Sequence, residues 1–215
     1  MSDSFKEKFR QAVAETEAVV YSYLPEETGH QKTIFEAMNY SVKAGGKRLR
    51  PLLMREVYRL FGGNGPEIGP FMAAMEMIHT SSLIHDDLPC MDNDEYRRGK
   101  LTTWKAYGYD MAVLAGDALM IYAFETASKA FSMGADPAKV GRAIGILAEK
   151  TGIYGMIGGQ TVDVELTGKA IPREKLDFIY RLKTGALLEA SMMIGAVLAG
   201  ASDEEIREVE TMASE

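Results

Sequence analysis

The sequence is poor in cysteine, with one residue, Cys90, in a chain of 215. No disulfide can therefore form within the chain, which favours a reducing compartment. The first residues also lack the pattern of a secretory signal, in which a basic start precedes an apolar run. The sequence thus predicts a cytoplasmic protein.

An excess of basic residues is lacking too, because 31 aspartates and glutamates outnumber 24 lysines and arginines, giving a formal net charge of −7. Broad binding to nucleic acid or to an anionic membrane requires a basic face, so neither is expected. The longest apolar stretch, 185–201, contains Glu189 and is shorter than the ~20 residues that span a bilayer. We interpret it as a buried core helix and predict no membrane span.

Strand patterns are nearly absent, whereas Ala, Leu, Met, Glu and Lys recur between helix start and stop signals. The predicted fold class is all-α, with a single helical domain over residues 1–215. Helices are predicted at 4–23, 32–43, 49–61 (starting at 49 or 51), 68–87, 111–131, 137–166, 172–200 and from 202 onward. The last begins at a capping box, Ser202 to Glu205, and has no stop signal, so we expect a C-terminally truncated chain.

The segment 85–99, HDDLPCMDNDEYRRG, places five carboxylates within ten residues. Asp86 and Asp87 lie at the C-terminal end of a predicted helix, where the helix dipole and mutual repulsion disfavour two anions. Pro89 breaks the helix and allows Asp92 to approach them. Carboxylates are hard ligands, and Mg²⁺ uses few of them while phosphate oxygens complete its shell. The segment predicts a magnesium site for a diphosphate, with a solvated acidic loop as the alternative. An EF-hand is excluded, because the glycine at the sixth loop position is missing.

Two segments supply clustered cations. The segment GGKRLRP, at 45–51, places three cations, Lys47 and Arg50 among them, after two glycines and at a helix start, which suits phosphate binding. Arg97 and Arg98 follow the acidic cluster and could contact two different anions, although an adjacent pair on a surface commonly has no function.

Single residues elsewhere are weaker indications. Lys183 and Thr184 give a cation and a hydroxyl in an apolar helix, although a lysine stem lying along the helix surface explains the same pattern. His79 lies two helical turns before Asp86 and would be close to the acidic site, unless it is an ordinary core histidine. Gln160 lies in a glycine-rich helical segment whose glycines could serve packing alone.

Together these segments resemble the trans-prenyl diphosphate synthases that make farnesyl and geranylgeranyl diphosphate. The resemblance rests on GGKRLRP (45–51), IHTSSLIHDDLPCMDND (78–94), RRG (97–99), GGQTVD (158–163) and KTG (183–185), in order along most of the chain. It implies an antiparallel helical bundle around a deep central cavity, usually in a homodimer. The implied reaction elongates an allylic diphosphate by head-to-tail condensation with isopentenyl diphosphate, with Mg²⁺ as the cofactor.

The resemblance also implies roles for the motif residues. The implied magnesium ligands are Asp86, Asp87 and Asp92, which grip the allylic diphosphate. The residues implied to hold the same group are Arg97, Gln160 and Lys183, with Thr184 beside the reacting carbons. The residues implied to bind isopentenyl diphosphate are Lys47, Arg50, His79 and Arg98. The catalytic set is Asp86, Asp87, Lys183 and Thr184. Ionisation of the allylic diphosphate then gives a carbocation that the double bond of isopentenyl diphosphate attacks.

Product length is expected to depend on the residue five before Asp86, which is Ser81, about 7 Å along the helix axis. Similar enzymes that make farnesyl diphosphate with this spaced motif commonly have an aromatic residue there, and serine leaves more room. We therefore expect geranylgeranyl diphosphate or a longer product, with farnesyl diphosphate as the alternative. Bulky residues could close the cavity instead: Met111, Met120, Tyr122 or Phe124.

Two features depart from the family pattern. Leu101 and Trp104 stand where relatives commonly have proline and a small, polar or histidine residue. No second aspartate-rich motif follows Glu165, so half of the expected magnesium ligands are missing. We therefore expect the truncated chain to be inactive alone.

Two other interpretations stay open at this point. One is a noncatalytic regulatory subunit of a prenyl diphosphate synthase, which a truncation favours and the intact acidic and basic sets disfavour. The other is a terpene cyclase, which also ionises prenyl diphosphates but needs no isopentenyl diphosphate site. The cations Lys47, Arg50 and His79 favour the synthase over the cyclase.

Overall fold

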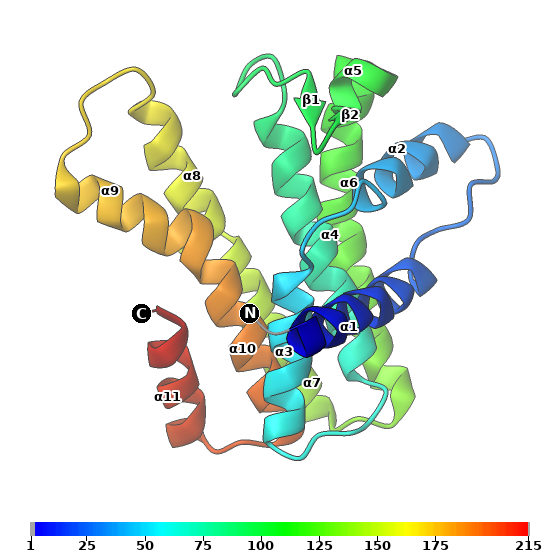
Figure 1. Ribbon diagram of the computed structural model, residues 1–215, viewed down its shortest axis with the longest axis vertical. Helices are drawn as coiled ribbons and strands as arrows, with labels where there is room; N and C mark the ends of the chain where they lie inside the picture. Colours follow the sequence, from blue (N-terminus) through cyan, green and yellow to red (C-terminus); the bar gives the residue numbers. More distant parts are fainter. Residues whose placement is uncertain (1–2, 215) are drawn as a thin grey trace. The chain divides into compact units, whose positions relative to one another are not determined.

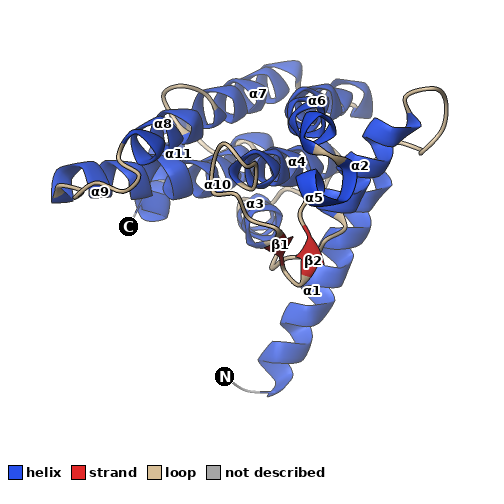
Figure 2. Cartoon of the chain, turned by 90° about the horizontal axis from the view of Figure 1, so that it is seen from above, coloured by secondary structure: helices blue, strands red, loops and turns tan. Residues whose placement is uncertain are grey.

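The computed structural model describes residues 3–214, and nearly all of its elements are helices (Figure 2). The α-helices are α1 (Asp3–Ser22), α2 (Lys32–Val42), α3 (Leu49–Leu60), α4 (Ile68–Asp86), α5 (Thr103–Tyr107), α6 (Tyr109–Ser128), α7 (Pro137–Thr151), α8 (Met156–Glu165), α9 (Arg173–Ile179), α10 (Ala186–Ala199) and α11 (Asp203–Ser214). A 3₁₀-helix, η1 (Lys129–Met133), and a π-helix, η2 (Tyr180–Gly185), join them. The predicted all-α class is confirmed.

The described residues gather into two compact units. Unit 1 comprises the residues up to Leu49 together with Met72–Ala127, and unit 2 comprises Arg50–Phe71 together with the residues from Ser128 onward. Each is described below by itself. The single domain expected from the sequence stays a prediction.

Unit 1 is built on α4, whose residues from Met72 to Ile78 are all buried. An α-helix that is apolar on almost every side belongs in a core. α6 approaches it closely at Gly116, where an added Cβ would lie 2.1 Å from Nε2 of His85. Tyr122 on α6 donates a hydrogen bond of 3.0 Å to the carbonyl of Tyr23, just after α1. The approach at Gly116 places α6 against the C-terminal end of α4, where the acidic loop begins.

Unit 2 is built on α10, which is buried along most of its length. Gly195 lets α3 approach, since a Cβ there would lie 2.4 Å from the carbonyl oxygen of Met54. α11 begins as predicted with a capping box, in which the Ser202 amide donates to Glu205 Oε2 at 2.7 Å and the Glu205 amide to Ser202 Oγ at 3.3 Å. α7, α10 and α11 lie together in Figure 1.

Several elements differ from the sequence predictions. The helix predicted over 137–166 is broken, because α7 ends at Thr151 and α8 starts at Met156. Gly155 allows the tight turn between them, since a Cβ there would lie 2.0 Å from the carbonyl oxygen of Lys150. The helical run predicted over 172–200 is present but contains the π-helix η2.

A short hairpin and a short helix were not predicted. The strands β1 (Tyr96–Arg97) and β2 (Lys100–Leu101) pair antiparallel, with Tyr96 opposite Leu101 and Arg97 opposite Lys100, and α5 follows. Two-residue strands give no periodicity from which a sequence pattern can be recognised.

Two helical stretches have the length and the apolar composition of a membrane-crossing helix. They are Tyr109–Met133 and Arg173–Ala199, and in their most apolar windows 39% and 61% of the residues are buried. The prediction that the chain has no membrane span considered the stretch 185–201 alone. It stays a prediction.

Candidate active site

The acidic cluster forms a loop that folds back on the end of α4. α4 ends at Asp86, and the amide of Asp92 donates a hydrogen bond of 2.9 Å to the carbonyl of Asp86. The amide of Asn93 donates a hydrogen bond of 3.1 Å to the carbonyl of Leu88. The chain therefore reverses after Pro89 and brings the backbone of Asp92 beside that of Asp86, whereas the convergence of the carboxylates stays a prediction.

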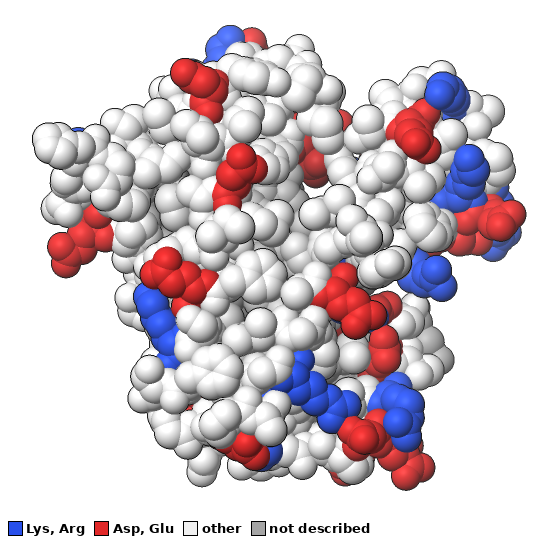
Figure 3. All heavy atoms as spheres, turned by 180° about the vertical axis from the view of Figure 1, so that it is seen from behind, with Lys and Arg blue, Asp and Glu red and all other residues white. Residues whose placement is uncertain are grey.

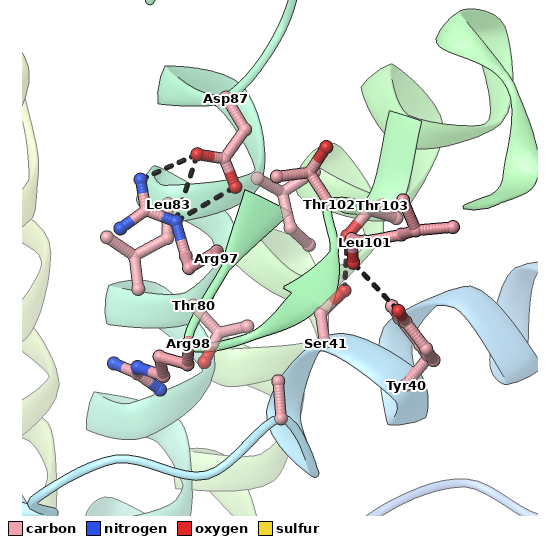
Figure 4. A pocket seen from close by; sticks show the side chains of 12 residues that line it. Tyr40, Ser41, Thr80, Leu83, Asp87, Arg97, Arg98, Leu101, Thr102 and Thr103 are labelled. Atoms are coloured by element: carbon pink, nitrogen blue, oxygen red, sulfur yellow. Dashed lines mark hydrogen bonds and ion pairs between the residues drawn. The ribbon is translucent and has the colours of Figure 1, made fainter. Parts of the chain in front are cut away.

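Asp87 is held by Arg97 of the hairpin (Figure 4). Nε of Arg97 lies 2.9 Å from both carboxylate oxygens of Asp87, and Nη2 lies 2.6 Å from Oδ1. Burial raises the pKa of Asp87, which is only 3% exposed, and Arg97 opposes that rise. The hydrogen bonds that Arg97 donates to Asp87 in turn raise the pKa of Arg97, so the guanidinium stays charged. In this arrangement Asp87 orients Arg97, and its predicted role as a metal ligand stays a prediction.

Trp104 and Leu101, the two departures from the family pattern, secure the hairpin. Nε1 of Trp104 and the hydroxyl of Thr102 each donate a 2.8 Å hydrogen bond to the carbonyl of Asp94. The carbonyl of Leu101 accepts a 2.7 Å hydrogen bond from the hydroxyl of Tyr40 on α2. These contacts join the acidic loop and α2 to the strand pair that carries the two arginines.

Arg98 lies against the glycine pair of the 45–51 segment. Its Nη1 donates to the carbonyl of Gly45, and a Cβ at Gly46 would lie 2.8 Å from that nitrogen. Gly45 and Gly46 have φ angles of 89° and 147°, which suit glycine. Burial lowers the pKa of Arg98. The contact of Arg98 with Gly45 therefore joins the arginine pair to the first basic segment within unit 1. Lys47, which follows the glycines, is exposed.

A recess of about 30 Å³ lies between these segments. Figure 4 shows Arg97 turned toward Asp87, and Arg98 turned away from it. The residues that line the recess include Tyr40, Ser41, Thr80, Asp87, Arg97, Arg98 and Thr102. Its volume suits water, since pockets for whole organic ligands measure ~300–1,000 Å³.

Arg48, the middle cation of the 45–51 segment, is buried and was not singled out from the sequence. It has a φ of 50° and is 2% exposed. Its Nη1 bonds Glu76 Oε1 at 2.7 Å, and its Nε bonds Glu17 Oε1 at 3.1 Å. A signal existed in the sequence, because Glu76 is a lone acid among the apolar residues of α4, and a buried acid requires a cation.

Ser81 is completely buried on α4, one and a half turns before Asp86. Its hydroxyl donates a 2.8 Å hydrogen bond to the carbonyl of Ile78 and lies 4.0 Å from Sδ of Met120 on α6. Of the four bulky residues considered from the sequence, Met120 is thus placed beside Ser81. His79 is half-buried on the same helix.

Three of the predicted residues of unit 2, Gln160, Lys183 and Thr184, lie on α8 and on η2. Nζ of Lys183 lies 2.6 Å from Oδ2 of Asp163, an ion pair that joins the two elements. Gly159 permits the approach, because a Cβ there would lie 2.3 Å from the amide nitrogen of Lys183. π-helical turns are frequent at functional sites. Asp163 was noted beside Gln160 in the sequence but was given no role.

The predicted residues divide between the two units. Lys47, Asp86, Asp87, Asp92, Arg97 and Arg98 lie on connected segments of unit 1, whereas Arg50, Gln160, Lys183 and Thr184 belong to unit 2. Thr184 is exposed, and Arg50 is half-buried as the second residue of α3.

The donor chemistry of the acidic loop suits magnesium. Carboxylates are its preferred protein ligands, and the folded-back loop supplies two, Asp86 and Asp92, from adjacent positions. Among the described residues no three His, Cys, Asp or Glu side chains converge as a metal site. Magnesium commonly takes one or two protein carboxylates and completes its shell with water and phosphate, so the pair fits the ion.

Comparison with proteins of known sequence gives consistent matches. The chain is 50% identical over 184 residues to the large subunit 1 of the chloroplastic heterodimeric geranylgeranyl pyrophosphate synthase of Arabidopsis thaliana, covering 84% of this chain and 50% of that protein. It is 42% identical over 213 residues to the farnesyl diphosphate synthase of Geobacillus stearothermophilus, covering 99% of this chain and 70% of that protein. The chain therefore spans about half the length of the plant relatives.

Solved structures also match. A crystal structure of an FPP/GFPP synthase from Zymomonas mobilis, without ligand, superimposes with a TM-score of 0.91 at 35% identity, covering all of this chain and 77% of that one. The geranyltransferase of Legionella pneumophila matches with a TM-score of 0.89 at 32% identity, covering 97% of this chain and 73% of that one. The sequence profile of the polyprenyl synthetase family matches residues 31–215. Because this match covers most of the sequence, the chain belongs to the polyprenyl synthetase family.

Proposed function

We propose that the protein is a prenyltransferase of isoprenoid biosynthesis that elongates an allylic diphosphate with isopentenyl diphosphate. The observation that carries the proposal is the meeting, within unit 1, of the folded-back acidic loop with Arg97, Arg98 and the glycine pair before Lys47. Carboxylates for a metal and cations for phosphate thus lie on connected segments, as a reaction between two diphosphates requires.

Two sets of residues would bind the two diphosphates. Arg97 and Arg98 have different partners, Asp87 and Gly45, so the two guanidiniums serve different sides of the hairpin. We assign Arg97, with Lys183 and Gln160, to the allylic diphosphate. The remaining cations, Arg98 with Lys47, Arg50 and His79, are assigned to isopentenyl diphosphate.

Asp86 and Asp92 would hold magnesium, and Asp87 would keep Arg97 in position. Bound Mg²⁺ would supply charge that stabilises the departing diphosphate. The positive charges of Arg97 and of Lys183 would each stabilise the negative charge that develops on the departing diphosphate. Thr184 is assigned to the region of the reacting carbons. No side chain of the protein is required as a nucleophile.

The product and the assembly are the finer parts of the proposal. Ser81 would let a geranylgeranyl or longer chain extend along α4, with Met120 of α6 beside it.

A homodimer is proposed through α6, whose Leu114 and Ile121 are 54% and 70% exposed and lie seven residues apart on one face. The single cysteine, Cys90, is exposed and favours a reducing compartment such as the cytoplasm.

The test of the proposal compares two proteins, the 215-residue chain and a chimera that adds the last part of the Geobacillus stearothermophilus enzyme. No adjacent pair of aspartates follows Asp87 in this sequence, so the chain alone should show little turnover of dimethylallyl and isopentenyl diphosphates. The chimera should incorporate labelled isopentenyl diphosphate in the presence of Mg²⁺. Lys47→Ala should abolish most of this incorporation, and Arg59→Ala, on the exposed part of α3, should not.

Two results would contradict the proposal. A folded chimera that forms no prenyl product would remove the assigned activity. Rapid turnover by the chain alone would contradict the expected dependence on further carboxylates.

A further inference from the structure

We propose that Arg48 is a positioning residue for the binding of isopentenyl diphosphate, because its buried bonds set the loop that presents Lys47 and meets Arg98. The inference rests on the proposed function and adds a residue to it. Arg48 stands between Lys47 and Arg50, the two cations to which phosphate binding was assigned, and it differs from Lys47 in being almost completely buried.

Arg48 is withdrawn from contact with a phosphate in solution, because it is buried and four of its five N–H donors are already used. Its Nε donates to Glu17, its Nη1 to Glu76, and its Nη2 to the Tyr21 hydroxyl at 3.1 Å and to the Val42 carbonyl at 2.8 Å. Four acceptors thus occupy a group with five N–H donors. Burial alone would lower its pKa, but Glu76 and Tyr21 raise it overall, so Arg48 remains a cation.

These bonds tie the loop after α2 to three helices. Glu17 and Tyr21 lie on α1, Val42 is the last residue of α2, and Glu76 lies in the buried middle of α4. The loop needs such support, because Arg48 has a φ of 50° in the left-handed region that an arginine rarely adopts. The fork of the guanidinium suits this role better than an ammonium would.

The same loop carries the contact with the arginine pair. Arg98 donates to the carbonyl of Gly45, three residues before Arg48, and its guanidinium packs on Gly46. The position of Gly45 and Gly46 therefore fixes the placement of Arg98 relative to Lys47. If Arg48 no longer held the loop, the two cations would lose their fixed separation, although neither had been changed.

The experiment uses two mild variants, Arg48→Lys and Tyr21→Phe, with Arg59→Lys as the matched control. Amide hydrogen exchange of residues 43–49 is measured first, without ligand, and should be faster in both test variants than in the wild type. The affinity for isopentenyl diphosphate is then measured by calorimetry, below the melting temperature of each variant and without added metal. Arg48→Lys should weaken binding about tenfold, the scale of a lost charged hydrogen bond, and the control less than about twofold.

The outcomes separate the inference from the proposed function. If the wild type binds isopentenyl diphosphate and Arg48→Lys binds it equally well, the inference is overturned and the proposed function stands. If the wild type shows no binding, the proposed function fails and the inference fails with it. A merely structural role would lower the melting temperature and leave the affinity of the folded chain unchanged, which also contradicts the inference. Should Arg48→Lys not fold, the same comparison is decided by Tyr21→Phe, which keeps every charge.

Discussion

Three cations follow the glycine pair at 45–46, and their surroundings differ. Lys47 is exposed, Arg48 is buried in a network of four acceptors, and Arg50 is half-buried in α3. A similar division occurs in the acidic loop, where Asp87 is buried on Arg97 while Asp92 is exposed. At this scale, burial determines which charges of a motif can meet a ligand and which orient their neighbours.

Ser81 gives a prediction at the residue scale. Because Ser81 is fully buried, the ring in Ser81→Tyr would occupy space on the face of α4 that lies against Met120 of α6. We expect the active chimera carrying Ser81→Tyr to make shorter products, measured by chromatography of the dephosphorylated prenyl alcohols. Overpacking should also lower the free energy of unfolding by about 1–3 kcal/mol. Ser82→Tyr, one position away on a less buried face, is the control, and an unchanged product length in Ser81→Tyr would disprove the role.

The elements of unit 2 depend on close backbone approaches and on one buried charge cluster. α8 meets η2 at Gly159, and the ion pair of Lys183 with Asp163 spans the same contact. On the other side of α10, Lys150 of α7 bonds Glu189 of α10 and lies 2.7 Å from Glu210 of α11. The hydroxyl of Ser214 also reaches Glu189 at 2.8 Å, so α11 is tied to α10 near its end.

Gly159→Ala tests the approach of α8 to the π-helix. The new Cβ would lie 2.3 Å from the amide nitrogen of Lys183, so the helices must separate. We expect the free energy of unfolding to fall by about 1–3 kcal/mol. Gly145→Ala is the control, since nothing lies within 4 Å of a Cβ on that exposed position of α7. Gly145→Ala should raise the free energy of unfolding by about 1 kcal/mol through helix propensity. Urea titrations that give the same change for Gly159→Ala and Gly145→Ala would rule out the packing argument.

Lys150→Met tests the cluster that holds α11. Burial lowers the pKa of Lys150, but the bonds to Glu189 and Glu210 outweigh it, so the folded pKa lies above the usual 10.5. A raised folded pKa gives stability that is present in full below about pH 10.5 and is lost as the pH rises through the folded value. The variant should be less stable by about 3–5 kcal/mol at neutral pH, because Glu189 is left buried without its cation.

Urea titrations across the pH range provide the measurement for this variant. The difference between wild type and Lys150→Met should stay constant to about pH 10 and shrink above it. Lys175→Met, at an exposed position of α9, should show no such difference. A difference that grows with pH would show that the sign of the linkage is wrong.

At the scale of the whole molecule, charge is mixed rather than segregated on the face drawn in Figure 3, where acidic and basic side chains lie near one another among large uncharged areas. The excess negative charge of the chain, −7 in total, is therefore not gathered into one acidic patch on this face. The local cations beside the acidic loop, rather than the overall charge, are what would attract diphosphates.

Assembly gives the prediction at this scale. Ile121→Glu would place a charge on the exposed apolar side chains of α6, and we expect it to convert a dimer to a monomer in sedimentation velocity. Leu60→Glu, at a position that is 77% exposed in α3, is the control and should leave the dimer intact. A wild-type chain that sediments as a monomer would contradict the proposed homodimer.

Patterns along the chain were sufficient for the class of the fold and for most helix bounds, and they predicted the ligand chemistry. Apolar spacing, proline and glycine signals depend on neighbours along the chain, so they placed the helices up to Asp86 within about one residue and identified the capping box at Ser202. The order of acidic and basic motifs likewise indicated a metal–diphosphate site, because the types of side chain restrict the possible ligands.

Which of those charges face one another became known from the folded chain. The pairing of Asp87 with Arg97, the burial of Arg48 on Glu76 and the hydrogen bond of Arg98 to Gly45 join residues up to 53 positions apart. The break at Gly155 and the π-helix before Ala186 interrupt the regular helical period on which the sequence predictions rested. Electrostatic and packing energies depend on distance in space, and a linear pattern of residue types does not contain those distances.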